Sequence, residues 1–83
     1  MAKVVEYKGS IEKDLRKIER EKGATILAVL EKNLIEGEKS SKPLSGSFKG
    51  LHRIRIGEYR AIYARTERGF LVLRIAHRKE VYR

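Results

Sequence analysis

The sequence contains no cysteine, and this absence excludes several kinds of protein. Without thiols, the chain has neither disulfide bonds nor thiolate metal ligands. Its two histidines have no carboxylate partners at metal-binding spacing, so we expect no metal site and no cofactor. The apolar core alone must therefore stabilise the fold.

Long apolar runs are also absent. Residues 1–5 lack the hydrophobic region of a signal peptide, and no run approaches the roughly 18 residues of a membrane span. We therefore expect a cytoplasmic protein with no membrane partner. No serine–histidine–acid arrangement and no glycine-rich phosphate loop stands out, which excludes the common hydrolase and nucleotide-binding motifs.

The length of 83 residues, 41% of them hydrophobic, predicts a single domain over residues 1–83, because two cores would each be too small. The net charge of +9 is unevenly distributed along this domain. Residues 1–41 hold nine basic and eight acidic side chains, net +1, whereas residues 42–83 hold eleven and three, net +8. This asymmetry favours a polyanionic partner, nucleic acid or an acidic protein, over a protein that is merely basic.

The apolar pattern predicts the order of the elements. Residues 3–7 are typical of a strand, and Ser10 is placed to cap a helix that runs from Ile11 towards Gly23. A second helix is predicted between Thr25 and Gly37, joined to the first by a short turn. Residues 37–50 form a connector that contains the only proline, and the strands that follow are predicted at 51–56, 59–64 and 70–76.

This β-α-α-β-β-β order predicts an α+β domain, an antiparallel sheet with an N-terminal helical hairpin packed on one face. The turn Gly57-Glu58 is suited to a type II′ hairpin, which sets Arg55 opposite Arg60 and Arg53 opposite Ile62. Ile54, Ile56, Tyr59, Ala61 and Tyr63 then share the core face. The arginines share the other face, where Arg55 facing Arg60 is unfavourable for the sheet and therefore indicates either a functional site or a solvated face.

The last predicted strand alternates in the same way. If Leu71, Leu73 and Ile75 point into the core, Arg74 joins the arginines, and residues 77–79 leave the strand beside them. Arginine side chains gathered on a sheet bind phosphate well, because the planar guanidinium makes bidentate hydrogen bonds and stays charged. The histidines at 52 and 77 are expected at strand ends on the core side, partly buried.

Three segments carry a resemblance to a known family: PLSG at residues 43–46, KGLHRIRIGEYRAIY at 49–63 and HRKEVY at 77–82. Together they resemble the RelE branch of the RelE/ParE toxin superfamily. The match covers about half of the chain directly, and the predicted order of elements agrees with that family's fold. The resemblance implies the toxin of a toxin–antitoxin pair, a ribosome-dependent endoribonuclease that cuts mRNA in the A site without a metal.

The resemblance also implies roles for individual residues. Arg60 would hold the scissile phosphate, Arg78 would stabilise its developing charge, and Tyr82 would stack on or orient the displaced nucleotide. The implied RNA-binding residues are Lys49, His52, Arg53, Arg55, Arg74, His77 and Lys79. Arg53 and Arg55 stand where family members often carry lysines, and arginine stays protonated. The proton acceptor is then His52, His77 or Tyr82, or no efficient base is present and the activity is attenuated.

The implied partners are the ribosome with its mRNA and a cognate, acidic, RelB-like antitoxin. The free toxin is expected to be a monomer that forms a hetero-oligomer with the antitoxin. Two alternatives stay open: a ParE-like toxin that poisons DNA gyrase without nuclease activity, and a non-catalytic relative that binds RNA or the ribosome.

Overall fold

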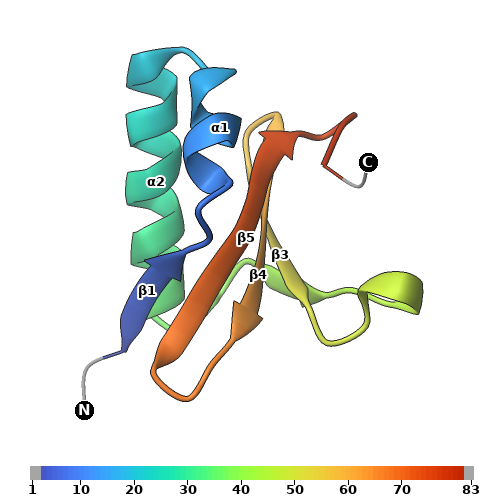
Figure 1. The fold of residues 1–83 in the computed structure, drawn as a ribbon. Helices are drawn as coiled ribbons and strands as arrows, with labels where there is room; N and C mark the ends of the chain where they lie inside the picture. The colour runs from blue at the N-terminus through green and yellow to red at the C-terminus, as the bar shows by residue number, and fades with distance from the viewer. Residues whose placement is uncertain (1–2, 82–83) are drawn as a thin grey trace.

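Five strands and two α-helices form the part of the chain that the computed structural model describes, residues 3–81. In chain order they are β1 (Val4–Tyr7), α1 (Ile11–Arg16), α2 (Arg20–Ile35), β2 (Ser41–Pro43), β3 (His52–Ile56), β4 (Tyr59–Arg65) and β5 (Gly69–His77), with a 3₁₀ turn, η1 (Gly46–Phe48), before β3. The helices form a hairpin on one side of the sheet, and the turn after β5 lies on the other side (Figure 1). The predicted α+β class and the helical hairpin are confirmed.

The sheet has the strand order β1-β5-β4-β3-β2 and is mixed rather than purely antiparallel. β1 pairs with β5 in the parallel direction, while all other pairs are antiparallel. The backbones of β1 and β5 approach closely where Val4 pairs with Gly69. A Cβ on Gly69 would lie only 2.3 Å from the carbonyl oxygen of Val4. Gly69 also has a φ of 149°, so only glycine fits this contact without strain.

The predicted connector contains one short strand. β2 pairs with β3 through Ser41 opposite Ile54 and forms an edge of the sheet. Pro43 is tolerated at this edge because an edge strand does not need every backbone N–H for pairing. The sequence did not predict this strand, since its three residues have no apolar alternation.

The helix boundaries also differ from the prediction. Ser10 occupies the position before α1, but its side chain makes no capping hydrogen bond, and α1 ends at Arg16 while α2 begins at Arg20. Gly23 is therefore a buried residue of α2, not a helix terminator, and Thr25 donates its hydroxyl to the carbonyl of Glu21 within the helix. A Cβ on Gly23 would lie 3.7 Å from the Leu15 side chain, an ordinary van der Waals distance, so the packing of the two helices leaves room for an alanine here.

The β3–β4 hairpin has the predicted register, with Ile56 opposite Tyr59 and Arg55 opposite Arg60. Gly57 has a φ of 60°, and Glu58 does not share this positive value, as a type II′ turn requires. The turn therefore fixes which side chains face the helices. Buried residues of both helices and of β3, β4 and β5 form the main core, with Leu30, Leu34, Ile54, Ala61, Tyr63 and Val72 fully inaccessible to solvent.

β5 does not alternate as expected. The register shifts by one between β4 and β5, so that Ile62 pairs with Arg74 but Tyr63 pairs with Val72, which leaves Leu73 as the extra residue of a β-bulge. Before the bulge, Phe70 and Val72 point into the core instead of Leu71 and Leu73. After it, Ile75 is in the core as predicted, and Arg74 keeps its place on the opposite face.

Candidate functional site: an arginine face on the sheet

Four arginines lie on the face of the sheet opposite the helices. The pairings Arg55–Arg60, Arg53–Ile62 and Ile62–Arg74 put their side chains on the same side of three neighbouring strands. We call Arg53, Arg55, Arg60 and Arg74 the arginine face. Arg55 is exposed and the other three are partly buried, and the Nε of Arg74 is inaccessible to solvent.

A small apolar cluster borders these arginines. Ile62, Ala76 and Val81 are buried together, and Leu44 and Leu51 pack against them. Val81 is only 1% exposed although it lies four residues beyond the end of β5, and its backbone N–H donates to the carbonyl of His77 at 3.1 Å. The C-terminal turn is therefore anchored on the face that carries the arginines.

This turn is also held by the β3–β4 turn. The backbone N–H of Arg78 donates to the carbonyl of Glu58 at 2.8 Å, and the Arg78 Nε lies 3.1 Å from the Glu58 carboxylate. The His77 Nε2 lies 3.9 Å from the same carboxylate. Arg78 is thereby placed at the rim of the arginine face, together with the exposed Lys79.

His77 faces the helix side of the sheet, as its parity predicts. It pairs with Tyr59, whose ring it meets edge to face at 5.7 Å between centroids. Its Nδ1 accepts a 3.2 Å hydrogen bond from the backbone N–H of Lys79. In the neutral ring the proton is therefore on Nε2, directed to the side where Glu58 lies.

His52 lies away from the arginine face. It pairs with Tyr63 and stacks on that ring at 5.5 Å between centroids, and its Nδ1 is buried without a hydrogen-bond partner. The structure therefore separates His52 from the other candidate residues. Lys49 is exposed in the loop that leads into β3, and Tyr82 lies outside the described residues.

Glu58 is the residue of this site that the sequence did not predict, because its position after Gly57 indicates only a turn residue. The available signal was charge: Glu58, Glu67 and Glu80 are the only acidic residues in the basic half of the chain. An acid adjacent to a hairpin of arginines is the natural partner for one of them.

No group of three or more potential metal ligands occurs among residues 3–81.

A polar cluster on the helix side anchors the loop after α2. The Tyr63 hydroxyl donates to the Glu38 carboxylate and contacts the Ser41 hydroxyl, while Arg65 Nε lies 3.1 Å from Glu38. Burial and the Glu38 carboxylate raise the pKa of Tyr63 to about 12. Burial alone would raise the pKa of Glu38, but the hydrogen bonds from Tyr63 and Arg65 outweigh it and leave that pKa lowered.

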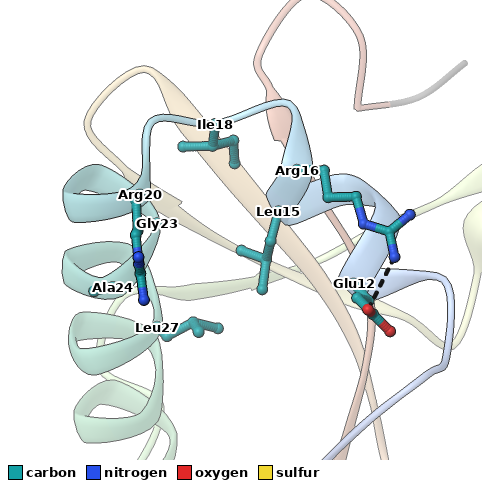
Figure 2. A pocket seen from close by; sticks show the side chains of 8 residues that line it. All are labelled: Glu12, Leu15, Arg16, Ile18, Arg20, Gly23, Ala24 and Leu27. Atoms are coloured by element: carbon teal, nitrogen blue, oxygen red, sulfur yellow. Dashed lines mark hydrogen bonds and ion pairs between the residues drawn. The ribbon is translucent and has the colours of Figure 1, made fainter.

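A second surface feature is a groove of about 890 Å³ between α1 and α2 (Figure 2). Leu15, Ile18 and Leu27 supply its apolar wall, and Arg16 and Arg20 lie along it. A smaller hollow beside Tyr7 continues the groove, since both are lined by Glu12, Leu15 and Leu27.

No helix among residues 3–81 is long and apolar enough to cross a membrane.

The chain matches a known protein family and shares its fold with several solved structures. A family model described as the ParE toxin of the type II toxin–antitoxin system parDE matches residues 5–82. The fold is similar to solved toxin–antitoxin complexes, each with low sequence identity to the chain. They include RelBE2 from Mycobacterium tuberculosis, with a TM-score of 0.82 and 23% identity over 94% of this chain and 100% of the other.

Two further complexes have the same fold. DinJ–YafQ from Escherichia coli has a TM-score of 0.75 at 21% identity, with all of both chains covered. RelB–RelE from Methanococcus jannaschii has a TM-score of 0.68 at 22% identity, over 93% of this chain and 94% of the other. No curated protein sequence matches the chain.

Proposed function

Because the chain belongs to the ParE toxin family of type II toxin–antitoxin systems, we propose that its arginine face binds mRNA on the ribosome and that the protein cleaves it. The RelE/ParE superfamily predicted from the hairpin and terminal motifs is thus confirmed at the level of the family. The observation that supports a nuclease is the gathering of Arg53, Arg55 and Arg60 on one sheet face, with Arg78 held by Glu58 beside it.

The proposed reaction is attack of an RNA 2′-hydroxyl on the adjacent phosphate. The O2′–P bond forms and the P–O5′ bond breaks, which leaves a 2′,3′-cyclic phosphate and a new 5′-hydroxyl end. One proton leaves O2′ and one is delivered to O5′. Arg60 holds the phosphate and Arg78 stabilises the charge that develops on it, because guanidinium groups make charge-assisted bonds to phosphate oxygens.

The proton acceptor is one of the three residues that the family resemblance left open. His52 is a poor candidate, because its ring is stacked on Tyr63 at the helix side of the sheet. His77 also faces the helix side, and its Nδ1 already accepts the Lys79 N–H, so Tyr82, which follows directly on Val81 in the sequence, is the candidate that we favour. Tyr82 is further proposed to orient the displaced nucleotide, with Lys49, Arg74 and Lys79 as contacts to the RNA backbone.

A cognate acidic antitoxin is the proposed protein partner. The groove between α1 and α2 offers an apolar wall beside Arg16 and Arg20, which suits a segment with alternating apolar and acidic side chains. The chain's net charge of +9 favours the same partner. Ala24→Glu in the groove is then expected to abolish neutralisation but leave toxicity intact, whereas Ala28→Glu, exposed on the same helix but outside the groove lining, is expected to change neither.

The test of the nuclease uses purified protein and ribosomes programmed with a defined mRNA. New RNA ends are mapped by primer extension, with Arg60→Ala measured in parallel. New 5′-hydroxyl ends at the A-site codon that disappear with the variant support the proposal. Ribosome binding without cleavage contradicts it and leaves the attenuated RNA-binding relative.

A gyrase-directed toxin is the second candidate, because the family model that matches is that of ParE. This candidate predicts inhibition of DNA supercoiling by purified gyrase and no new RNA ends. A gyrase-directed toxin would not need the arginine face to bind RNA. The two assays therefore separate the candidates directly.

A further inference from the structure

Glu58 makes two separate contacts with Arg78 from a position 20 residues earlier in the chain. Its carbonyl accepts the Arg78 backbone N–H at 2.8 Å, and its carboxylate lies 3.1 Å from the Arg78 Nε. The first contact fixes the backbone where the C-terminal turn leaves β5. The second fixes the direction of the guanidinium group.

The carboxylate occupies only one edge of this guanidinium. An arginine side chain has five N–H donors in a planar fork, and the atom that forms the ion pair with Glu58 is Nε, at 3.1 Å. The edge formed by the two terminal nitrogens remains for a phosphate, which it can bind through two parallel hydrogen bonds. A carboxylate at Nε is thus compatible with phosphate binding by the same side chain.

The charge of Glu58 works against the binding of a polyanion. Residues 42–83 have a net charge of +8, and a carboxylate at the rim reduces the local positive potential. The ion pair is also more than half exposed on both sides, so it contributes little stability. Neither RNA affinity nor folding therefore explains the carboxylate at this position.

We propose that Glu58 is a positioning residue for Arg78, which it holds in the direction required for charge stabilisation during cleavage. This inference rests on the proposed nuclease function. Restricting the rotamers of a long side chain before the substrate arrives lowers the entropy lost in the transition state. Glu58 thus lowers RNA affinity and raises the cleavage rate.

The test compares Glu58→Ala with Glu58→Gln, using Glu67→Gln in the β4–β5 loop as the control. On ribosomes programmed with mRNA, Glu58→Ala is expected to cut at least about tenfold more slowly, with ribosome affinity unchanged or tighter. Glu58→Gln keeps a side-chain oxygen beside Nε but removes the charge and is expected to recover part of the rate, while Glu67→Gln cuts like the parent protein. Unchanged rates in both Glu58 variants, or a loss of affinity that matches the loss of rate, would overturn the proposal.

A second measurement separates the positioning role from the nuclease function. In nitrogen-15 NMR spectra of the free protein, the Nε–H of Arg78 is expected to exchange with water more slowly than that of Arg68, whose side chain is 72% exposed. Glu58→Ala is expected to abolish the difference. If this holds but the parent protein cuts no RNA, the nuclease function fails while the positioning of Arg78 stands. Equal exchange in the parent protein contradicts the positioning itself.

Discussion

The carboxylate of Asp14 in α1 accepts a 3.0 Å hydrogen bond from the backbone N–H of Ile75 in β5. The bond joins residues 61 positions apart in the chain. It lies two residues after Leu73, the extra residue of the β-bulge, where the ladder to β4 is disturbed. Asp14 thus supplies an acceptor to a strand whose pairing is interrupted and ties the helical hairpin to the sheet.

Removing this acceptor is expected to destabilise the fold. Asp14→Ala should lower the free energy of unfolding by about 1–3 kcal/mol, because a partly buried backbone N–H loses its partner. Asp14→Asn retains an acceptor and should recover most of the loss. Glu12→Ala is the control, since its ion pair with Arg16 is exposed and should contribute less than about 0.5 kcal/mol. Urea unfolding measures all three variants, and equal values for Asp14→Ala and Glu12→Ala would contradict the role.

Arg60 is expected to be required for toxicity but not for folding. It lies partly exposed on the arginine face, so Arg60→Ala should leave the unfolding midpoint nearly unchanged. Cleavage of programmed mRNA should fall about a hundredfold or more, as when a transition-state donor is removed. Arg68→Ala, whose side chain is 72% exposed beside Glu6, is the matched control and should cut normally. Unfolding of Arg60→Ala at ordinary temperature would show that the arginine is structural.

Arg55 directly faces Arg60 across the hairpin, and this like-charge pair should reduce stability. Arg55→Thr is therefore expected to raise the free energy of unfolding by a few tenths of a kcal/mol, up to about 1 kcal/mol. The same variant should bind RNA more weakly and with a shallower dependence on salt, since one phosphate contact is lost. A loss of stability together with unchanged RNA binding would contradict both expectations.

Val81 is expected to link the C-terminal turn to activity. Its buried side chain packs with Ile62 and Ala76, outside the main core. Val81→Ala should cost about 1–2 kcal/mol and should reduce cleavage more than stability alone explains, because Arg78 lies in the turn that it anchors. Val29→Ala, at a position 43% exposed on α2, should change neither property. Hydrogen exchange of the Val81 and Glu80 amides reports the release of the turn.

Tyr63 should make stability depend on alkaline pH. Its pKa of about 12 in the folded state lies above the ordinary value of 10.0. The contribution of Tyr63 to the free energy of unfolding is therefore complete below pH 10 and is lost as the pH rises towards 12. Tyr63→Phe should cost about 1–3 kcal/mol at neutral pH and should show a smaller decline between pH 10 and 12. Urea unfolding at pH 8 and pH 11 tests this, with Tyr59→Phe as the control. An equal decline in the parent protein and in Tyr63→Phe would contradict the assignment.

Glu38 should make the stability of the fold depend on pH in the acidic range. Its lowered pKa means that its contribution is present above pH 4.5 and is lost as the pH falls through the folded-state value. Glu38→Gln should therefore flatten the acid side of the stability profile. Glu36→Gln, exposed at the end of α2, is the matched control and should leave that side unchanged.

The sequence by itself determined the local features of this protein. Gly57 and Glu58 set a two-residue turn, and because side chains alternate along a strand, the turn determined the register and the face of every arginine in the hairpin. Apolar spacing determined that two helices follow the first strand. The motifs of the hairpin and the C-terminus determined the superfamily.

Only the tertiary structure decided the non-local features. The parallel pairing of β1 with β5 joins distant segments, and no turn residue records it. The bulge at Leu73 reverses the alternation in β5, although either set of apolar side chains could have faced the core. Glu58 and Arg78 meet for the same reason, since their contact depends on where β5 ends beside the β3–β4 turn. Local residue patterns determine turns and faces, whereas contacts across the sheet follow from how all the elements pack together.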